Sequence, residues 1–198
     1  KRDLYVWNIE TDEVIQVTDD RFDDVDPSWL PNSRELIFTS DRPHPDNPAL
    51  DPEGHPYARP GVLMPGDFDY GSYNLFRIDI DVRLPDPIDV GPGPNKVAKV
   101  SPDGDKIAFI SARNGIDNLY IAYLDSSRVF AVTDILGGVI HHSWGPESDR
   151  IAMSAFHKGR FDIFVMKDIA PVGENGVLAP TDFVLGEFLV NGPAHAFG

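Results

Sequence analysis

Three of the six histidines, side chains that suit metal or acid–base chemistry, lie in one stretch, HHSWGPESDRIAMSAFHKG, which runs from His141. His141 and His142 are adjacent, His157 follows sixteen residues after His141, and His195 lies near the end of the chain. Imidazole nitrogens bind transition metals when several of them converge on one point. Whether these converge depends on the elements that carry them.

Those elements belong to a repeat. Three segments each read as a bulky residue, a proline two positions on, a polar turn and an apolar strand: WLPNSRELIFTSDR from Trp29, VSPDGDKIAFISAR from Val100 and WGPESDRIAMSAFH from Trp144. A second motif recurs at intervals of 71, 44 and 44 residues: DLYVWNIE at Asp3, NLFRIDID at Asn74, NLYIAYLD at Asn118 and DIFVMKDI at Asp162. Two independent landmarks with the same spacing indicate a repeated structural unit.

Each unit is predicted to consist of strands. In KIAFISA and NLYIAYL both alternating faces are largely apolar, which is typical of strands covered on both sides. The turns PNSR, PDGD and PESD are hairpin signals. We predict four strands per unit, at about 97–101, 106–111, 117–124 and 128–132 in the best-defined one. Four antiparallel strands repeated about every 44 residues predict an all-β fold, a β-propeller built of four-stranded antiparallel blades.

The segment VSPDGDKIAFISARNGIDNLYIAYLD resembles the WD40-like "PD40" repeat of the TolB-type propellers. The signature of that family is S-P-D-G, an apolar strand, S-x-R, and then an Asx-apolar-aromatic strand. The resemblance implies a propeller of the kind found in the periplasmic TolB scaffold. The same family includes propeller domains of prolyl-oligopeptidase-like and tricorn-like proteases, and propellers of polysaccharide lyases.

The repeat boundaries divide the whole chain, residues 1–198, as a partial propeller. Residues 1–20 form half a blade, and residues 21–92 a blade with a Pro/Gly-rich insert at about 43–73. Residues 93–134 and 135–190 form two further blades, and residues 191–198 begin another. We therefore expect an incomplete arc of about three to four blades from a six- to eight-bladed propeller, because an open arc leaves apolar faces bare. Closure by a second copy of the chain is the alternative.

Aligning the first strands of the units places Pro27, Ala98, His142 and His195 at one equivalent position. His142 and His195 would then lie on adjacent blades near the central channel, and a third ligand such as His141 or an aspartate would complete a metal site. The resemblance to propeller lyases implies the same, because some of them bind metal through inner-strand histidines. Successive strand residues point to opposite faces, however, so His141 and His142 cannot both face one metal. The other interpretation is a solvated or hydrogen-bonded channel histidine.

The acidic stretch DDRFDDVDP precedes a predicted channel strand. Its carboxylates could bind Ca²⁺, although their spacing is not that of an EF-hand loop, or they could form a solvated acidic rim. The insert at 43–73 lies on the same predicted face, as a lid over the channel or as a packing flap. Six residues on this side are the candidates for partner binding: Asp23, Asp24, Asp26, His141, His142 and His195.

Other residues recur with the repeat and suit structural roles. Arg42 and Arg113 end the S-x-R motif and are predicted to brace the blade through hydrogen bonds. His157 stands where the next arginine would be, and we expect it in a loop. Aromatic residues at one position of the third strands are predicted to pack between blades: Tyr5, Phe76, Tyr120 and Phe164.

Composition limits the functions that fit. The chain has 32 acidic and 17 basic residues, a net charge of −15, which disfavours binding to nucleic acid or to acidic membrane surfaces. It has no cysteine and no apolar run long enough to cross a membrane. It also lacks a G-x-S-x-G elbow, an H-E-x-x-H motif, a P-loop and a dinucleotide fingerprint, so no catalytic residue is assigned.

These observations favour a non-catalytic binding scaffold, a TolB-like propeller that presents a channel-face funnel to a protein or peptide partner. The remainder of its own propeller is a second predicted partner. The alternative is the propeller domain of a larger enzyme, a protease or a metal-dependent polysaccharide lyase, and a structural spacer in a large surface protein is a third option. No cofactor is predicted beyond the divalent metal considered at the histidines. The resemblance implies a periplasmic or extracellular location.

Overall fold

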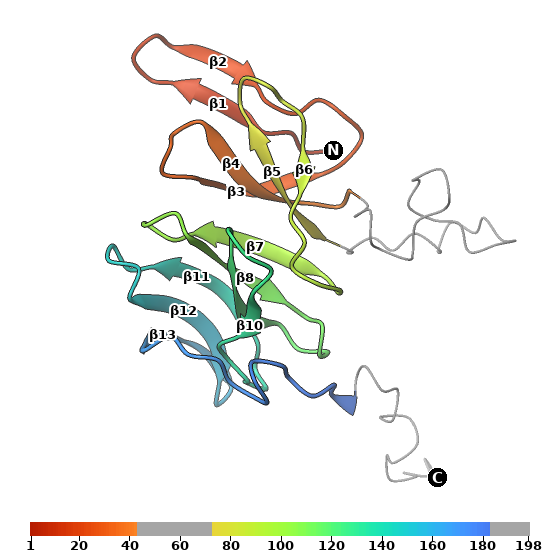
Figure 1. The fold of residues 1–198 in the computed structure, drawn as a ribbon, viewed down its shortest axis with the longest axis vertical. Coiled ribbons are helices and arrows are strands. Elements are labelled where there is room, and N and C mark those ends of the chain that lie inside the picture. Colours follow the sequence, from red (N-terminus) through yellow and green to blue (C-terminus); the bar gives the residue numbers. More distant parts are fainter. Residues whose placement is uncertain (43–72, 183–198) are drawn as a thin grey trace, which may run out of the picture.

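The computed structural model describes residues 1–42 and 73–182, which form four antiparallel sheets stacked in sequence order (Figure 1). We call these sheets the first to fourth blades. The first blade contains β1 (Tyr5–Asn8) and β2 (Glu13–Gln16), and the second contains β3 (Asp24–Trp29), β4 (Glu35–Ser40), β5 (Asn74–Asp79) and β6 (Asp86–Pro87). The third contains β7 (Asn95–Val100), β8 (Lys106–Ser111), β9 (Asn118–Tyr123) and β10 (Val129–Ala131), and the fourth contains β11 (Val139–Trp144), β12 (Arg150–His157) and β13 (Arg160–Lys167).

The second and third blades confirm the predicted unit, because each is a four-stranded antiparallel meander in chain order. The strands of the third blade begin and end within about two residues of the predicted bounds. The first blade has two strands, which correspond in the repeat to the third and fourth strands of the other blades. The insert predicted at 43–73 lies outside the described residues except for its last residue.

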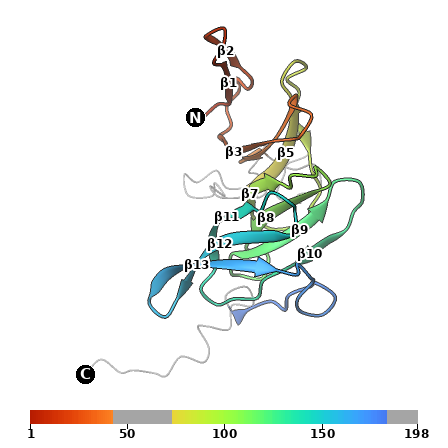
Figure 2. The ribbon, with the colours of Figure 1, turned by 90° about the vertical axis from the view of Figure 1, so that its left-hand side faces the viewer.

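The fourth blade departs from the prediction of four strands, because its described part has three. After β13 the chain crosses to the third blade and runs beside β10 (Figure 2). There the amide of Val172 donates to the carbonyl of Ala131 at 2.9 Å, and the amide of Ala131 donates to the carbonyl of Gly176 at 2.8 Å. A Cβ on Gly176, whose φ is 84°, would lie 2.4 Å from the Cβ of Phe130. The crossing segment therefore covers the edge of β10, which would otherwise be an unpaired strand edge.

Apolar side chains at the start of the third strands, or just before it in the case of Leu4, join each blade to the next one. Leu4 packs in the core between the first and second blades, Leu75 between the second and third, and Leu119 between the third and fourth. Ile163 holds the equivalent position in β13 and is 75% exposed. Both faces of the two central blades are thus covered, as their apolar strands predict.

The aromatic residues predicted to pack between blades do so in two of four cases. Phe76 and Tyr120 are buried against the preceding blade. Tyr5 is exposed because no described blade precedes its own, and Phe164 is about one third exposed.

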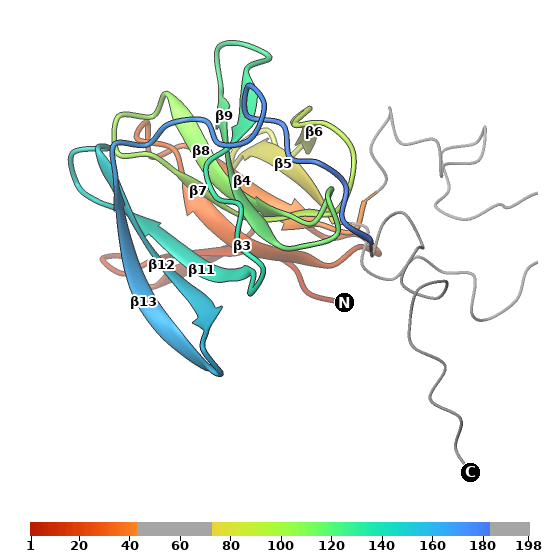
Figure 3. The same ribbon diagram turned by 90° about the horizontal axis from the view of Figure 1, so that it is seen from below.

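The inner strands β3, β7 and β11 lie side by side when the stack is viewed along its axis (Figure 3). The amide of Val100 in β7 donates to the Oγ of Ser28 in β3 at 3.0 Å, so neighbouring inner strands are hydrogen-bonded through a side chain. Each inner strand also has a register shift, and Asp26 and Val97 adopt positive φ there. In residues 1–42 and 73–182 the structure contains no helix of the length and hydrophobicity needed to span a membrane.

Candidate functional site

Equivalent positions between the blades can be compared directly, because the register repeats. Asp24 pairs with Ser40, Asn95 with Ser111, and Val139 with Ala155, each pair joining the first and second strands of a blade. The residue two positions beyond the second member is Arg42, Arg113 or His157 respectively. These three positions lie on one face of the stack, the face of the loops that enter the inner strands.

In the second blade, Arg42 fills this position. Its guanidinium contacts Asp20, and it forms a bidentate pair with Asp24, in which Nη2 lies 2.9 Å from Oδ2. The group also lies over the rings of Phe38 and Phe76. Burial lowers the pKa of Arg42, but the hydrogen bonds to Asp24 and Asp20 outweigh burial and leave that pKa raised. The predicted bracing role of Arg42 is confirmed.

In the third blade, Arg113 fills the same position without a carboxylate. Its Nη2 donates to the carbonyl of Val90 at 2.8 Å and to Oδ1 of Asn95 at 3.0 Å, and its Nε donates to Ser111. The guanidinium carbon lies 4.4 Å from the centre of the Tyr120 ring, a cation–π contact. Burial lowers the pKa of Arg113. The bracing prediction is confirmed here too.

In the fourth blade the position is open. Val139, Ala155 and His157 replace the acceptor, the hydroxyl and the guanidinium of the other blades. A cavity of about 560 Å³ lies at this place, lined by β12, β13 and the loop that enters β11. The guanidinium and the two side chains that hold it are all replaced, so the space between the loop and the strands stays unfilled.

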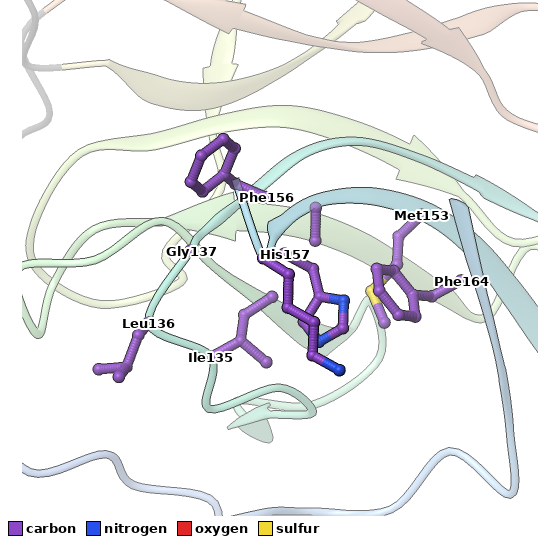
Figure 4. A pocket seen from close by; sticks show the side chains of 9 residues that line it. Ile135, Leu136, Gly137, Met153, Phe156, His157 and Phe164 are labelled. Carbon is purple, nitrogen blue, oxygen red and sulfur yellow. The ribbon is translucent and has the colours of Figure 1, made fainter. Parts of the chain in front are cut away.

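The cavity wall is mostly apolar (Figure 4). Met153, His157 and Phe164 lie together on the strand side, and Ile135 faces them from the loop. The rings of His157 and Phe164 meet edge to face with centres 5.8 Å apart. Of the residues that line the cavity, only His157 and Lys158 have polar side chains. The sequence analysis placed His157 in a loop. In the structure, His157 ends β12 and borders the cavity.

The acidic stretch is largely paired. Asp24 is fully buried with Arg42 and Ser40, and Asp23 accepts hydrogen bonds from Arg2 through both carboxylate oxygens. The hydrogen bonds from Arg2 lower the pKa of Asp23. Asp26 is exposed in the bulge of β3. Asp23 and Asp24 thus serve the fold, and of the three candidate aspartates, Asp23, Asp24 and Asp26, it is Asp26 that faces solvent.

The two histidines of β11 point to opposite sides, as the strand geometry predicts. His142 is buried, and its Nε2 lies 2.9 Å from the carbonyl oxygen of Ala108, whereas His141 is exposed. Burial lowers the pKa of His142 to about 4. Its Nδ1 is buried and has no hydrogen-bond partner among the described residues.

The metal prediction at these histidines stays a prediction. The contact between His142 Nε2 and the Ala108 carbonyl leaves Nδ1 as the nitrogen that could bind a metal, and His141 lies on the other side of the strand. Within residues 1–42 and 73–182, no three His, Asp or Glu side chains come close enough to hold a metal ion. His195, the third histidine of the metal prediction, lies outside the described residues.

The comparisons with known proteins show the fold. Over 90% of its length the chain superimposes on TolB from Acinetobacter baumannii, with a TM-score of 0.61 and 17% identity. Oligogalacturonate lyase in complex with manganese aligns with 82% of the chain at a TM-score of 0.54 and 12% identity, covering 40% of the lyase. A Bacteroides ovatus protein described as a dipeptidyl aminopeptidase IV aligns with 81% at a TM-score of 0.52 and 14% identity, covering 24% of that protein. The chain spans 38% of the A. baumannii TolB chain.

No protein-family model matches the sequence, and none of the curated proteins matches it significantly. At these identities the structural likeness establishes the fold alone. The chain has the all-β architecture of a β-propeller, with antiparallel four-stranded blades of the type found in TolB.

The sequence analysis did not find the cavity. The change is visible in the sequence when the three blades are aligned at equivalent positions. Asp24 and Asn95 are replaced by Val139, the two serines by Ala155 and the two arginines by His157. The sequence pattern of the repeat makes only the last of these changes plain, because the arginine belongs to the S-x-R motif. The joint replacement of the acceptor, the serine and the arginine, rather than of the arginine alone, indicates that this position between the blades is unfilled.

Proposed function

We propose that this chain belongs to a non-catalytic propeller scaffold that binds a protein or peptide on the face where the loops enter the inner strands. One observation carries the proposal: the cavity of the fourth blade opens on this face beside exposed apolar side chains. Leu136 is 92% exposed and Phe156 46% exposed, and both border the cavity. Apolar residues around an open cavity are typical of binding sites.

The framework behind this face suits recognition. The inner strands are joined by cross-blade hydrogen bonds, and guanidinium groups fill two of the three inter-blade positions. A rigid frame loses little conformational entropy on binding. Most of the free energy gained from contacts with a partner therefore contributes to the affinity. The TolB-type resemblance supports a periplasmic or extracellular location for such a scaffold.

Exposed apolar faces at both ends of the stack support a second partner, the remainder of the same propeller. Tyr5 and Trp7 are exposed on the outer face of the first blade, and Ile163 and Val165 on that of the fourth. In the central blades the residues equivalent to Tyr5 and Ile163 are buried by neighbouring blades. Further blades would cover these faces in the same way.

The test uses a matched pair of exposed leucines. Leu84 is 72% exposed in the loop between β5 and β6, on the face opposite to that of Leu136, because antiparallel strands alternate direction. A peptide library is selected on the immobilised chain. The enriched peptides are expected to lose at least tenfold in affinity for Leu136→Glu and to bind Leu84→Glu unchanged. Failure to enrich any peptide, or equal loss with both variants, contradicts the proposal.

The manganese-bound lyase structure motivates the second candidate, the propeller domain of a metal-dependent enzyme. Because the histidines of β11 do not converge, such a centre would need ligands from outside the described residues. Manganese or zinc that co-purifies in stoichiometric amount and is lost on His142→Ala would favour this candidate over the scaffold.

A further inference from the structure

The cavity of the fourth blade has a definite chemical character. Its strand wall carries Met153 and Phe164, and its loop wall carries Ile135 and Leu136. A volume of about 560 Å³ lies within the range of roughly 300–1,000 Å³ usual for ligand sites. This is room for more than one large apolar side chain, and the mostly apolar lining favours an apolar occupant.

One lysine, Lys158, lines the cavity, and it lies beside His157 at one end of the cavity. His157 and Lys158 are adjacent at the end of β12, where the hairpin turns towards β13. His157 is held by Phe164 on one side and lies 3.5 Å from a carboxylate oxygen of Asp162 on the other. Lys158 is exposed and has a positive φ of 49°, in the tight turn. An occupant with a negative group at one end would place that group beside the ammonium group of Lys158.

The equivalent positions show what the cavity excludes. Arg42 and Arg113 need an oxygen acceptor on the first strand and a hydroxyl on the second. Here those residues are Val139 and Ala155, so a buried guanidinium would lose its hydrogen bonds. Basic side chains of a partner are therefore disfavoured, despite the net charge of −15 of the chain.

We propose that this cavity binds the C-terminal end of a peptide, with apolar side chains in the cavity and the terminal carboxylate beside Lys158 and His157. The inference rests on the proposed function and names the chemistry of its ligand. Burial of apolar side chains supplies the affinity, and the charge of Lys158 fixes the direction of the peptide.

The experiment reports on the cavity itself. The chain has three methionines, so the full chain labelled with ¹³C at the methionine methyls gives few signals, and Met153→Leu identifies the one in the cavity wall. The probe is N-acetyl-leucyl-phenylalanine with a free carboxylate. The Met153 methyl is expected to shift in a saturable way while the Met166 methyl stays in place. The C-terminal amide of the probe is expected to bind about fivefold more weakly, the size of one exposed charge interaction.

A charge-reversed pair supplies the control. Lys158→Glu should weaken the free-acid probe about fivefold and leave the amide unaffected, whereas Lys167→Glu, at the other end of β13, should change neither. Both lysines are exposed, so neither change threatens folding. A Met153 methyl that does not respond at millimolar probe, or equal affinity for acid and amide, overturns the inference. If peptides selected on the chain still depend on Leu136, the proposed function survives that result; if no such peptides exist either, both fail.

Discussion

The indole N–H of Trp144 donates a hydrogen bond of 2.9 Å to the backbone carbonyl of Lys99, which joins the inner strand of the fourth blade to that of the third. Trp29 occupies the equivalent place in β3 and is 46% exposed, since the described part of the first blade contains no inner strand to receive it. A tryptophan at the same repeat position thus contacts the neighbouring blade in the fourth blade and is exposed to solvent in the second.

This contrast gives a prediction for stability. Trp144→Phe removes the donor but keeps an aromatic ring, and it should lower the free energy of unfolding by about 1–2 kcal/mol, because the Lys99 carbonyl loses its partner. Trp29→Phe should change it by less than about 0.5 kcal/mol, as expected for an exposed residue. Urea denaturation of the two variants measures the difference. Equal losses would mean that the blades do not meet through Trp144.

The buried pair of Arg42 and Asp24 gives a larger effect. Arg42→Met leaves the carboxylate of Asp24 buried without its cation, and this should cost about 3–5 kcal/mol in the free energy of unfolding. Arg42→Met combined with Asp24→Leu should recover most of that loss, since no charge remains buried. The exposed pair of Arg34 and Asp79 is the control, and Arg34→Met should cost no more than about 1 kcal/mol. Additive losses in the double variant would contradict the buried ion pair.

Burial of His142 predicts a pH dependence. Its pKa falls from the ordinary 6.5 to about 4 in the folded chain, so between these values the unfolded chain binds the proton more strongly. The stabilising contribution of the neutral ring is complete above pH 6.5 and is lost as the pH falls towards 4, by up to about 1.4 kcal/mol per pH unit. His142→Leu should remove this part of the slope, and His141→Ala should retain it. Unfolding free energies measured from pH 7 to pH 4.5 decide the matter; identical slopes in the chain and in His142→Leu would refute the burial.

Much of the fold could be predicted from the sequence because the repeat is encoded locally. Each turn after the proline sets a hairpin, and the apolar alternation of residues 106–111 and 118–123 defines strands buried on both faces. The opposite orientations of His141 and His142 followed from strand geometry alone.

Other features are not local and could not be predicted in this way. The path after β13 depends on hydrogen bonds between the backbone of Ala131 and the backbone of Val172 and Gly176. Backbone hydrogen bonds of this kind leave no pattern of side chains in the sequence. The pairing of Asp24 with Arg42 depends on the register of β3 with β4, so an acidic stretch that looked solvated is partly a structural element. The cavity could be predicted only by aligning the equivalent strands of three blades. The alignment shows that all the polar groups of this position are absent together in the fourth blade.

The central claim is that the inter-blade position filled by Arg113 in the third blade is an open cavity in the fourth. Ser111 and Ala155 are equivalent, and the chain has no cysteine, so Ser111→Cys and Ala155→Cys each introduce a single thiol at the two places. The most direct measurement is the rate at which a small maleimide modifies each thiol in the folded chain. We predict modification of Ala155→Cys at least tenfold faster than of Ser111→Cys, which Arg113 covers. Equal protection of both thiols would contradict the cavity, and with it the proposed binding site.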